Sequence, residues 1–133
     1  MAGETAASPI TCPPVAALAP PGGHYSHATR ANGWVFVSGQ LPITPQGERL
    51  AGRPFEQQAR QALANVAAAL QAAGSGIDRL LQVRVYVAGM EYWPAFDGIY
   101  AAWAGAARPA RAVVPTGLLH HGLLVEVEAV ALG

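Results

Sequence analysis

The spacing of hydrophobic residues changes along this chain of 133 residues, and that change constrains its fold more than any other feature. Between Phe55 and Ala73, apolar side chains recur every three or four positions, which is typical of a helix with one buried face. Between Leu81 and Val87, apolar residues alternate with polar ones, which is typical of a strand with one buried face. The chain therefore combines helices with half-buried strands.

Further elements are predicted from β-branched, aromatic and alanine-rich segments. A second, shorter helix is expected over Tyr92–Trp103, where Pro94 falls in the first turn. The other predicted strands span residues 24–31, Trp34–Ser38, Ala110–Thr116 and Leu123–Leu132. The resulting order, β-β-α-β-α-β-β, predicts an α+β fold in which two helices pack on one face of a sheet.

The length fits one domain over residues 1–133, since domains of this size are the commonest. The first 23 residues are rich in proline, which fixes φ and removes backbone donors. This segment is predicted to be an extended arm, with residues 1–16 loosely attached.

Composition excludes several classes of protein. Eight arginines balance eight acidic residues, so a strongly basic surface for nucleic acid or an anionic membrane is not expected. The absence of lysine excludes Schiff-base chemistry through that side chain. No segment has the length of a membrane span, and a cytoplasmic protein is expected. Only 12% of the residues are charged, so part of the apolar surface is predicted to be buried against another copy.

No metal or cofactor is predicted. The single cysteine, Cys12, excludes an internal disulfide and lies where nothing is expected to activate it. His120 and His121 are adjacent, so on a strand their side chains would point to opposite faces. Neither this pair nor His24 and His27 has a nearby carboxylate at helical spacing, so a metal site is not indicated.

Charged residues within apolar strands are the strongest functional signal. Arg111 lies in Pro-Ala-Arg-Ala-Val-Val, and Glu126 and Glu128 share one face of the last strand. Burying an unpaired charge costs several kcal/mol, so each group needs water, a partner or a ligand. Arg111 either pairs with one of the glutamates inside the sheet or holds a ligand carboxylate while a glutamate handles protons. The pattern leaves both alternatives open.

Several short motifs, correctly ordered and spaced, resemble one known family. Gly23-His24-Tyr25-Ser26-His27-Ala28 is similar to its GPYSQA, and Val35 to Pro42 is similar to lvfvSGQiP. Pro109-Ala110-Arg111 matches PaR, and Val125 to Ala131 matches vEieaiA. Over about residues 17–132, the chain resembles the RidA/YjgF family of enamine/imine deaminases, some of which carry an older endoribonuclease label.

The resemblance implies a chorismate-mutase-like fold with a mixed sheet, assembled as a homotrimer. Three sheets would line a central barrel, and pockets would lie between subunits. The implied reaction is hydrolysis of 2-imino acids, or their 2-enamine tautomers, to 2-oxo acids and ammonia without a cofactor.

The resemblance also assigns roles to individual residues. Arg111 would bind the substrate carboxylate, and Glu126 would orient or activate the attacking water. The positions that match pocket-lining residues of the family are Tyr25, Ser38, Gly39, Gln40, Asp97 and Val113.

The chain departs from the family pattern around this inferred pocket. Asp97 replaces an asparagine and would repel a substrate carboxylate unless it is remote or protonated. His27 stands where glutamine is frequent, Val113 replaces a cysteine, and His120 replaces a proline. An alternative is therefore a non-catalytic trimer that binds a small carboxylate or a partner protein. Endoribonuclease activity is disfavoured by the zero net charge.

Overall fold

The computed structural model describes residues 9–133, which contain five strands and two α-helices. The elements are β1 (Ala28–Ala31), β2 (Trp34–Gln40), α1 (Phe55–Ala72), β3 (Leu80–Val87), α2 (Trp93–Ala104), β4 (Ala110–Pro115) and β5 (Val125–Leu132). Short 3₁₀ turns precede β3, α2 and β5, and the last of them spans His120–Gly122. The predicted order β-β-α-β-α-β-β is confirmed.

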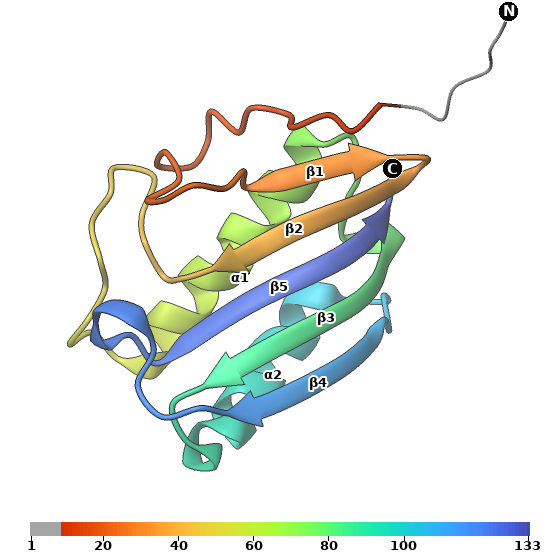
Figure 1. The fold of residues 1–133 in the computed structure, drawn as a ribbon. Coiled ribbons are helices and arrows are strands. Elements are labelled where there is room, and N and C mark those ends of the chain that lie inside the picture. The colour runs from red at the N-terminus through yellow and green to blue at the C-terminus, as the bar shows by residue number, and fades with distance from the viewer. Residues whose placement is uncertain (1–8) are drawn as a thin grey trace, which may run out of the picture.

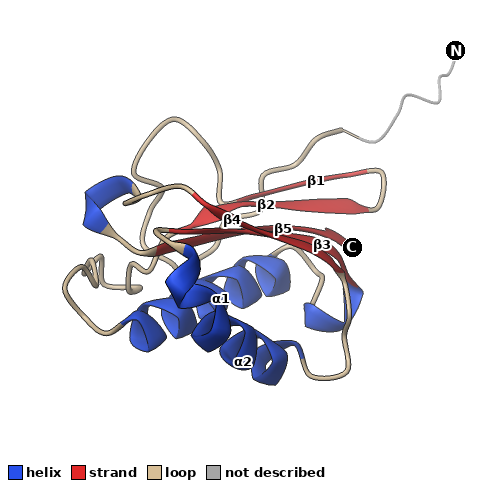
Figure 2. Cartoon of the chain, turned by 90° about the horizontal axis from the view of Figure 1, so that it is seen from below, coloured by secondary structure: helices blue, strands red, loops and turns tan. Residues whose placement is uncertain are grey.

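The strands form one mixed sheet in the order β1-β2-β5-β3-β4 (Figure 1). Strands β3 and β4 run parallel, and the other neighbours are antiparallel. A parallel pair requires a crossover connection, and α2 provides it. Both helices lie on the same side of the sheet (Figure 2), which confirms the predicted α+β architecture.

The core lies between the two helices and one face of the sheet. The predicted stripe of α1 is fully buried, including Leu63, Val66 and Leu70. Across from it, the inward-facing residues of the central strands, such as Val85 and Val127, are also inaccessible to solvent. Truncating such side chains to alanine typically costs about 2–5 kcal/mol, so this layer fixes the sheet that carries the site.

Neither α1 nor α2 covers the opposite face of the sheet (Figure 2). Trp34 and Phe36 of β2 are about half exposed there, at 45% and 50%. Glu128 accepts a hydrogen bond from the Tyr86 hydroxyl and lies 3.6 Å from Arg84 on this face. The face thus combines exposed aromatic side chains with a polar cluster.

The described part of the N-terminal arm is held at Thr11 by backbone pairing, at Leu18 by burial in the core and at Ala19 by His27. Thr11 and Arg30 exchange two backbone hydrogen bonds of 2.9 Å across the edge of β1, and residues 1–8 of the arm lie outside the described residues. β1 begins at Ala28, later than the predicted residue 24, because the chain first turns, with the Tyr25 amide donating to the Gly23 carbonyl. No described helix has the length and apolarity needed to cross a membrane.

Candidate functional site

A cavity of about 590 Å³ lies at the end of the sheet where β2 ends and β5 begins. In Figure 1, the yellow loop after β2 and the blue turn before β5 come to this end of the sheet, beside the segment that precedes β1. Three predicted pocket residues, Tyr25, Gly39 and Gln40, line the cavity. They are joined there by Asn65 of α1, whose amide donates to two carbonyls of the loop after β2.

Because Gly39 has no side chain, it leaves space for the carboxylate of Glu126. The pairing of β2 with β5 shifts register between Val37 and Gln40, so Gly39 lies in a bulge. A Cβ atom at Gly39 would overlap the Glu126 carboxylate, and the side chain of Glu126 therefore lies directly over the glycine. Bulges often re-aim side chains beside functional sites, and this one makes room for an acid next to the cavity.

Glu126 is half-buried, and this environment changes its proton affinity. Burial raises the pKa of its carboxyl above the usual value, and the nearby charge of Glu128 raises it further, while His120 opposes the shift. A carboxyl with a raised pKa beside a cavity is suited to general acid–base chemistry.

The wall around Gly39 is held by hydrogen bonds. His27 Nε2 lies 2.7 Å from the Ala19 carbonyl, which can only accept, so this nitrogen is the donor. Its Nδ1 then accepts from the Gln40 amide nitrogen at 3.2 Å. The Ser38 hydroxyl donates to the Ser26 carbonyl at 2.6 Å and does not line the cavity. His27 and Ser38 therefore position the wall by joining β2 to the segment before β1.

Arg111 lies in a different place, at the outer edge of the sheet. It is paired with Val83, which is fully buried under the helices, so Arg111 points to the helix side of β4. Its Nη1 donates to Asp97 Oδ1 of α2 at 2.9 Å, and its guanidinium lies 4.8 Å from the Tyr100 ring centre. Of the two alternatives left open by the sequence, pairing with a strand glutamate is therefore wrong, since the acid that pairs with Arg111 is Asp97.

A second cavity, of about 440 Å³, surrounds Arg111. It is lined by Asp97, Tyr100 and Arg108, among others. The Tyr100 hydroxyl is buried and has no hydrogen-bond partner among residues 9–133, and burial raises its pKa. Val113 packs against the core and lines neither cavity.

The two predicted catalytic residues are thus separated within one chain. Glu126 lies opposite Tyr86 on the face away from the helices, because its neighbours Val125 and Val127 are buried on the other face. β3 lies between the strands that carry Glu126 and Arg111. One chain therefore brings together Tyr25, Gly39, Gln40 and Glu126 in one region and Asp97 and Arg111 in another.

The first cavity also contains Arg49 and His121, which the sequence did not place at the site, and His120, which was noted there only as a departure from the family pattern. Arg49 comes from the loop after β2, and His120 and His121 come from the turn before β5. The two imidazole rings lie 3.6 Å apart, centre to centre. Within the described part of the chain, no three His, Cys, Asp or Glu side chains are placed to hold a metal ion.

Comparison with known proteins gives consistent matches over nearly the whole chain. The family model described as Endoribonuclease L-PSP matches residues 16–133. Protein HMF1 of Saccharomyces cerevisiae is 32% identical over 127 residues, covering 96% of this chain and 95% of that protein. The crystal structure of RidA from the Antarctic bacterium Psychrobacter sp. PAMC 21119 has a TM-score of 0.87 at 26% identity, covering 92% of this chain and 99% of that one. E. coli TdcF with bound serine has a TM-score of 0.85 at 26% identity, with coverages of 92% and 98%.

Proposed function

Because this chain belongs to the endoribonuclease L-PSP family, which includes the RidA/YjgF proteins, we propose that it hydrolyses 2-imino acids or their 2-enamine tautomers. The products are 2-oxo acids and ammonia. The observation that carries this proposal is the Glu126 carboxyl, which lies over Gly39 beside the first cavity with a raised pKa. Serine bound to the relative TdcF supports an amino-acid-like ligand.

The reaction makes modest demands on the protein, because an iminium carbon is already electrophilic. Glu126 accepts a proton from water as the water oxygen attacks C2, and the C=N double bond becomes a C–N single bond. The nitrogen of the resulting carbinolamine takes that proton back from Glu126. As ammonia leaves, the carbinol hydroxyl gives its own proton to the Glu126 carboxylate and the C=O bond of the 2-oxo acid forms. Glu126 then passes this proton to ammonia, which departs as ammonium. Positioned proton transfer of this kind typically contributes about 10²–10⁴-fold.

The proposed active assembly is a homotrimer in which Arg111 of a neighbouring copy completes the site. Arg111 and Glu126 lie on different faces of one sheet, so a single chain offers only half of the site. The face of the sheet that neither α1 nor α2 covers, with Trp34 and Phe36 exposed, provides apolar surface for such an assembly. Arg111 would then bind the substrate carboxylate.

The ion pair with Asp97 is compatible with that role. It uses one oxygen of Asp97 and one guanidinium nitrogen, and no described residue bonds the remaining nitrogens of Arg111. Those nitrogens remain to bind a ligand carboxylate while Asp97 holds the guanidinium in place.

A non-catalytic trimer that binds a small carboxylate is the second candidate. The separation of Arg111 from Glu126 within one chain favours it, because a carboxylate bound to Arg111 does not meet Glu126 of the same chain. In that case the protein would bind carboxylates without accelerating their release from imines.

The deciding experiment generates imines in situ with an amino-acid oxidase and times 2-oxo acid release with and without the protein. Faster release is expected, with a loss of about a hundredfold or more in Arg111→Met and no change in oligomeric state. Arg60→Met, an exposed arginine of α1, is the matched control and should keep full activity. An absence of acceleration across a broad imine panel would favour the binding protein.

A further inference from the structure

The first cavity has an unusual balance of charge. Its lining includes Arg49, His27, His120 and His121, and none of its lining residues is an aspartate or glutamate. The Glu126 carboxylate lies against Gly39, which lines one side of this space. The remaining lining is largely apolar or glycine, so the charged groups are concentrated at specific points of the wall.

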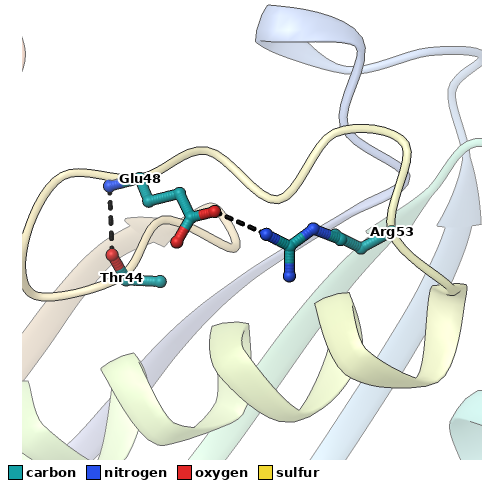
Figure 3. Close-up of polar contacts among 3 residues, drawn as sticks. All are labelled: Thr44, Glu48 and Arg53. Carbon is teal, nitrogen blue, oxygen red and sulfur yellow. Dashed lines mark hydrogen bonds and ion pairs between the residues drawn. The ribbon is translucent and has the colours of Figure 1, made fainter.

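Within residues 9–133, the side chain of Arg49 has no ion-pair or hydrogen-bond partner, and the loop explains why. The neighbouring acid, Glu48, accepts a hydrogen bond from Arg53 at 2.6 Å, and its amide donates to Thr44 Oγ1 at 3.0 Å, as Figure 3 shows. A bridge between Ile43 and Arg49 closes the same loop. Arg49 forms no ion pair or side-chain hydrogen bond with the part of the chain that the structure describes.

The two histidines lie next to this arginine. His121 has φ of 64°, a backbone conformation that is uncommon for residues other than glycine, so its side chain is held at the cavity at some cost. Burial lowers its pKa, and the positive charge of Arg49 and the neighbouring His120 lower it further. In either protonation state the imidazole of His121 carries a ring N–H that can donate to a ligand in the cavity.

We propose that Arg49, His120 and His121, here called the cationic wall, bind a second carboxylate of the substrate. The inference rests on the proposed deaminase function and specifies its substrate class as 2-imino dicarboxylic acids. One permanent cation with two imidazoles matches one carboxylate, which takes charge-assisted hydrogen bonds from the guanidinium and from ring N–H groups. A cavity of about 590 Å³ has room for a carbon chain between this wall and the carbon beside Glu126.

The test compares two imines of equal chain length, 2-iminoglutarate and 2-iminopentanoate, each made in situ by a suitable oxidase. The wild-type protein is expected to show a kcat/KM ratio of about tenfold to a hundredfold in favour of 2-iminoglutarate. In Arg49→Gln this ratio should fall towards one, and Arg49→Lys should retain part of it. Arg60→Gln should leave the ratio unchanged, and thermal melts of all variants check folding.

A binding measurement separates failure of this inference from failure of the deaminase function. Calorimetric titration with 2-oxoglutarate and 2-oxopentanoate reports the preference without turnover. Arg49-dependent binding of 2-oxoglutarate in the absence of imine hydrolysis would support the cationic wall and overturn the deaminase function. Equal hydrolysis of both imines by the wild type and Arg49→Gln would overturn the cationic wall and leave the deaminase function in place.

Discussion

The cavity around Arg111 and the cavity beside Gly39 hold their cations in different ways. Arg111 extends from an edge strand, is paired with Asp97 and lies over the Tyr100 ring. Arg49 extends from a loop, and its neighbouring acid is occupied by Arg53. Arg111 is held in position by Asp97 before a ligand binds, but it shares its charge with that carboxylate. Arg49 has no such partner among the described residues, so its full charge is available to a ligand, but its side chain must be ordered on binding.

From this difference we expect Arg111 and Arg49 to bind different parts of the substrate. The held arginine suits the carboxylate next to the reacting carbon, where position matters most for rate. The unpaired arginine suits a distal group, which adds affinity and selectivity. The predictions below test whether the reactive and distal roles are separated in this way.

Glu126→Gln is expected to have the largest effect. Turnover should fall about 10²–10⁴-fold with substrate affinity nearly unchanged, because the amide keeps the shape but cannot accept the proton. The wild-type rate should rise with pH as Glu126 ionises, and its raised pKa should move this rise to a higher pH than for an exposed glutamate. Initial rates measured against pH check both points.

The residual rate of Glu126→Gln should not rise with pH as the wild-type rate does. Arg49→Gln serves as the comparison, since a distal binding residue should leave the rise in place. A pH profile of Glu126→Gln that matches the wild type would exclude Glu126 as the general base.

Gly39→Ala should have the next largest effect. The added methyl would overlap the Glu126 carboxylate, so the side chain or the bulge must move. We expect a loss of about 1–3 kcal/mol in the free energy of unfolding, together with reduced turnover. Chemical denaturation and kinetic assays measure the two losses.

Gly98→Ala provides the matched control. Gly98 lies in α2, and a Cβ there would meet no atom within 4 Å. Alanine should therefore stabilise the helix by up to about 1 kcal/mol. Unchanged stability and turnover in Gly39→Ala would contradict the close contact between Gly39 and Glu126.

The sequence predicted the fold well because its periodic elements also form the core. The stripe of α1 and the alternation in β3 identified their buried faces, since burial is what sets those periods. The residues near Glu126 followed from a motif that is contiguous in β2, namely Ser38-Gly39-Gln40. Local periodicity was sufficient for the fold, and the resemblance to a known family supplied the pocket-lining positions.

The ion pair and the cationic wall depend on tertiary contacts instead. Asp97 reaches Arg111 only because α2 packs beside β4, and no local spacing specifies that meeting. Arg49 is placed at the cavity by the backbone hydrogen bonds of an irregular loop. Such a loop has no regular spacing of hydrophobic residues from which its shape could be predicted. The left-handed backbone at His121 likewise has no signal in its residue type.

Asp97→Asn should produce the smallest change, and it tests the comparison most directly. If Asp97 shares the guanidinium with the substrate, removing its charge should strengthen carboxylate binding to Arg111 by a few fold, seen as a lower KM. The free energy of unfolding should fall by less than about 1 kcal/mol, since the Asp97 side chain is 44% exposed and partly exposed ion pairs contribute little.

The change in KM should be equal for 2-iminoglutarate and 2-iminopentanoate, because both carry the carboxylate that Arg111 binds. A higher KM for both would instead mean that Asp97 acts mainly by holding Arg111 in position, and a change confined to 2-iminoglutarate would contradict the assignment of the distal carboxylate to Arg49.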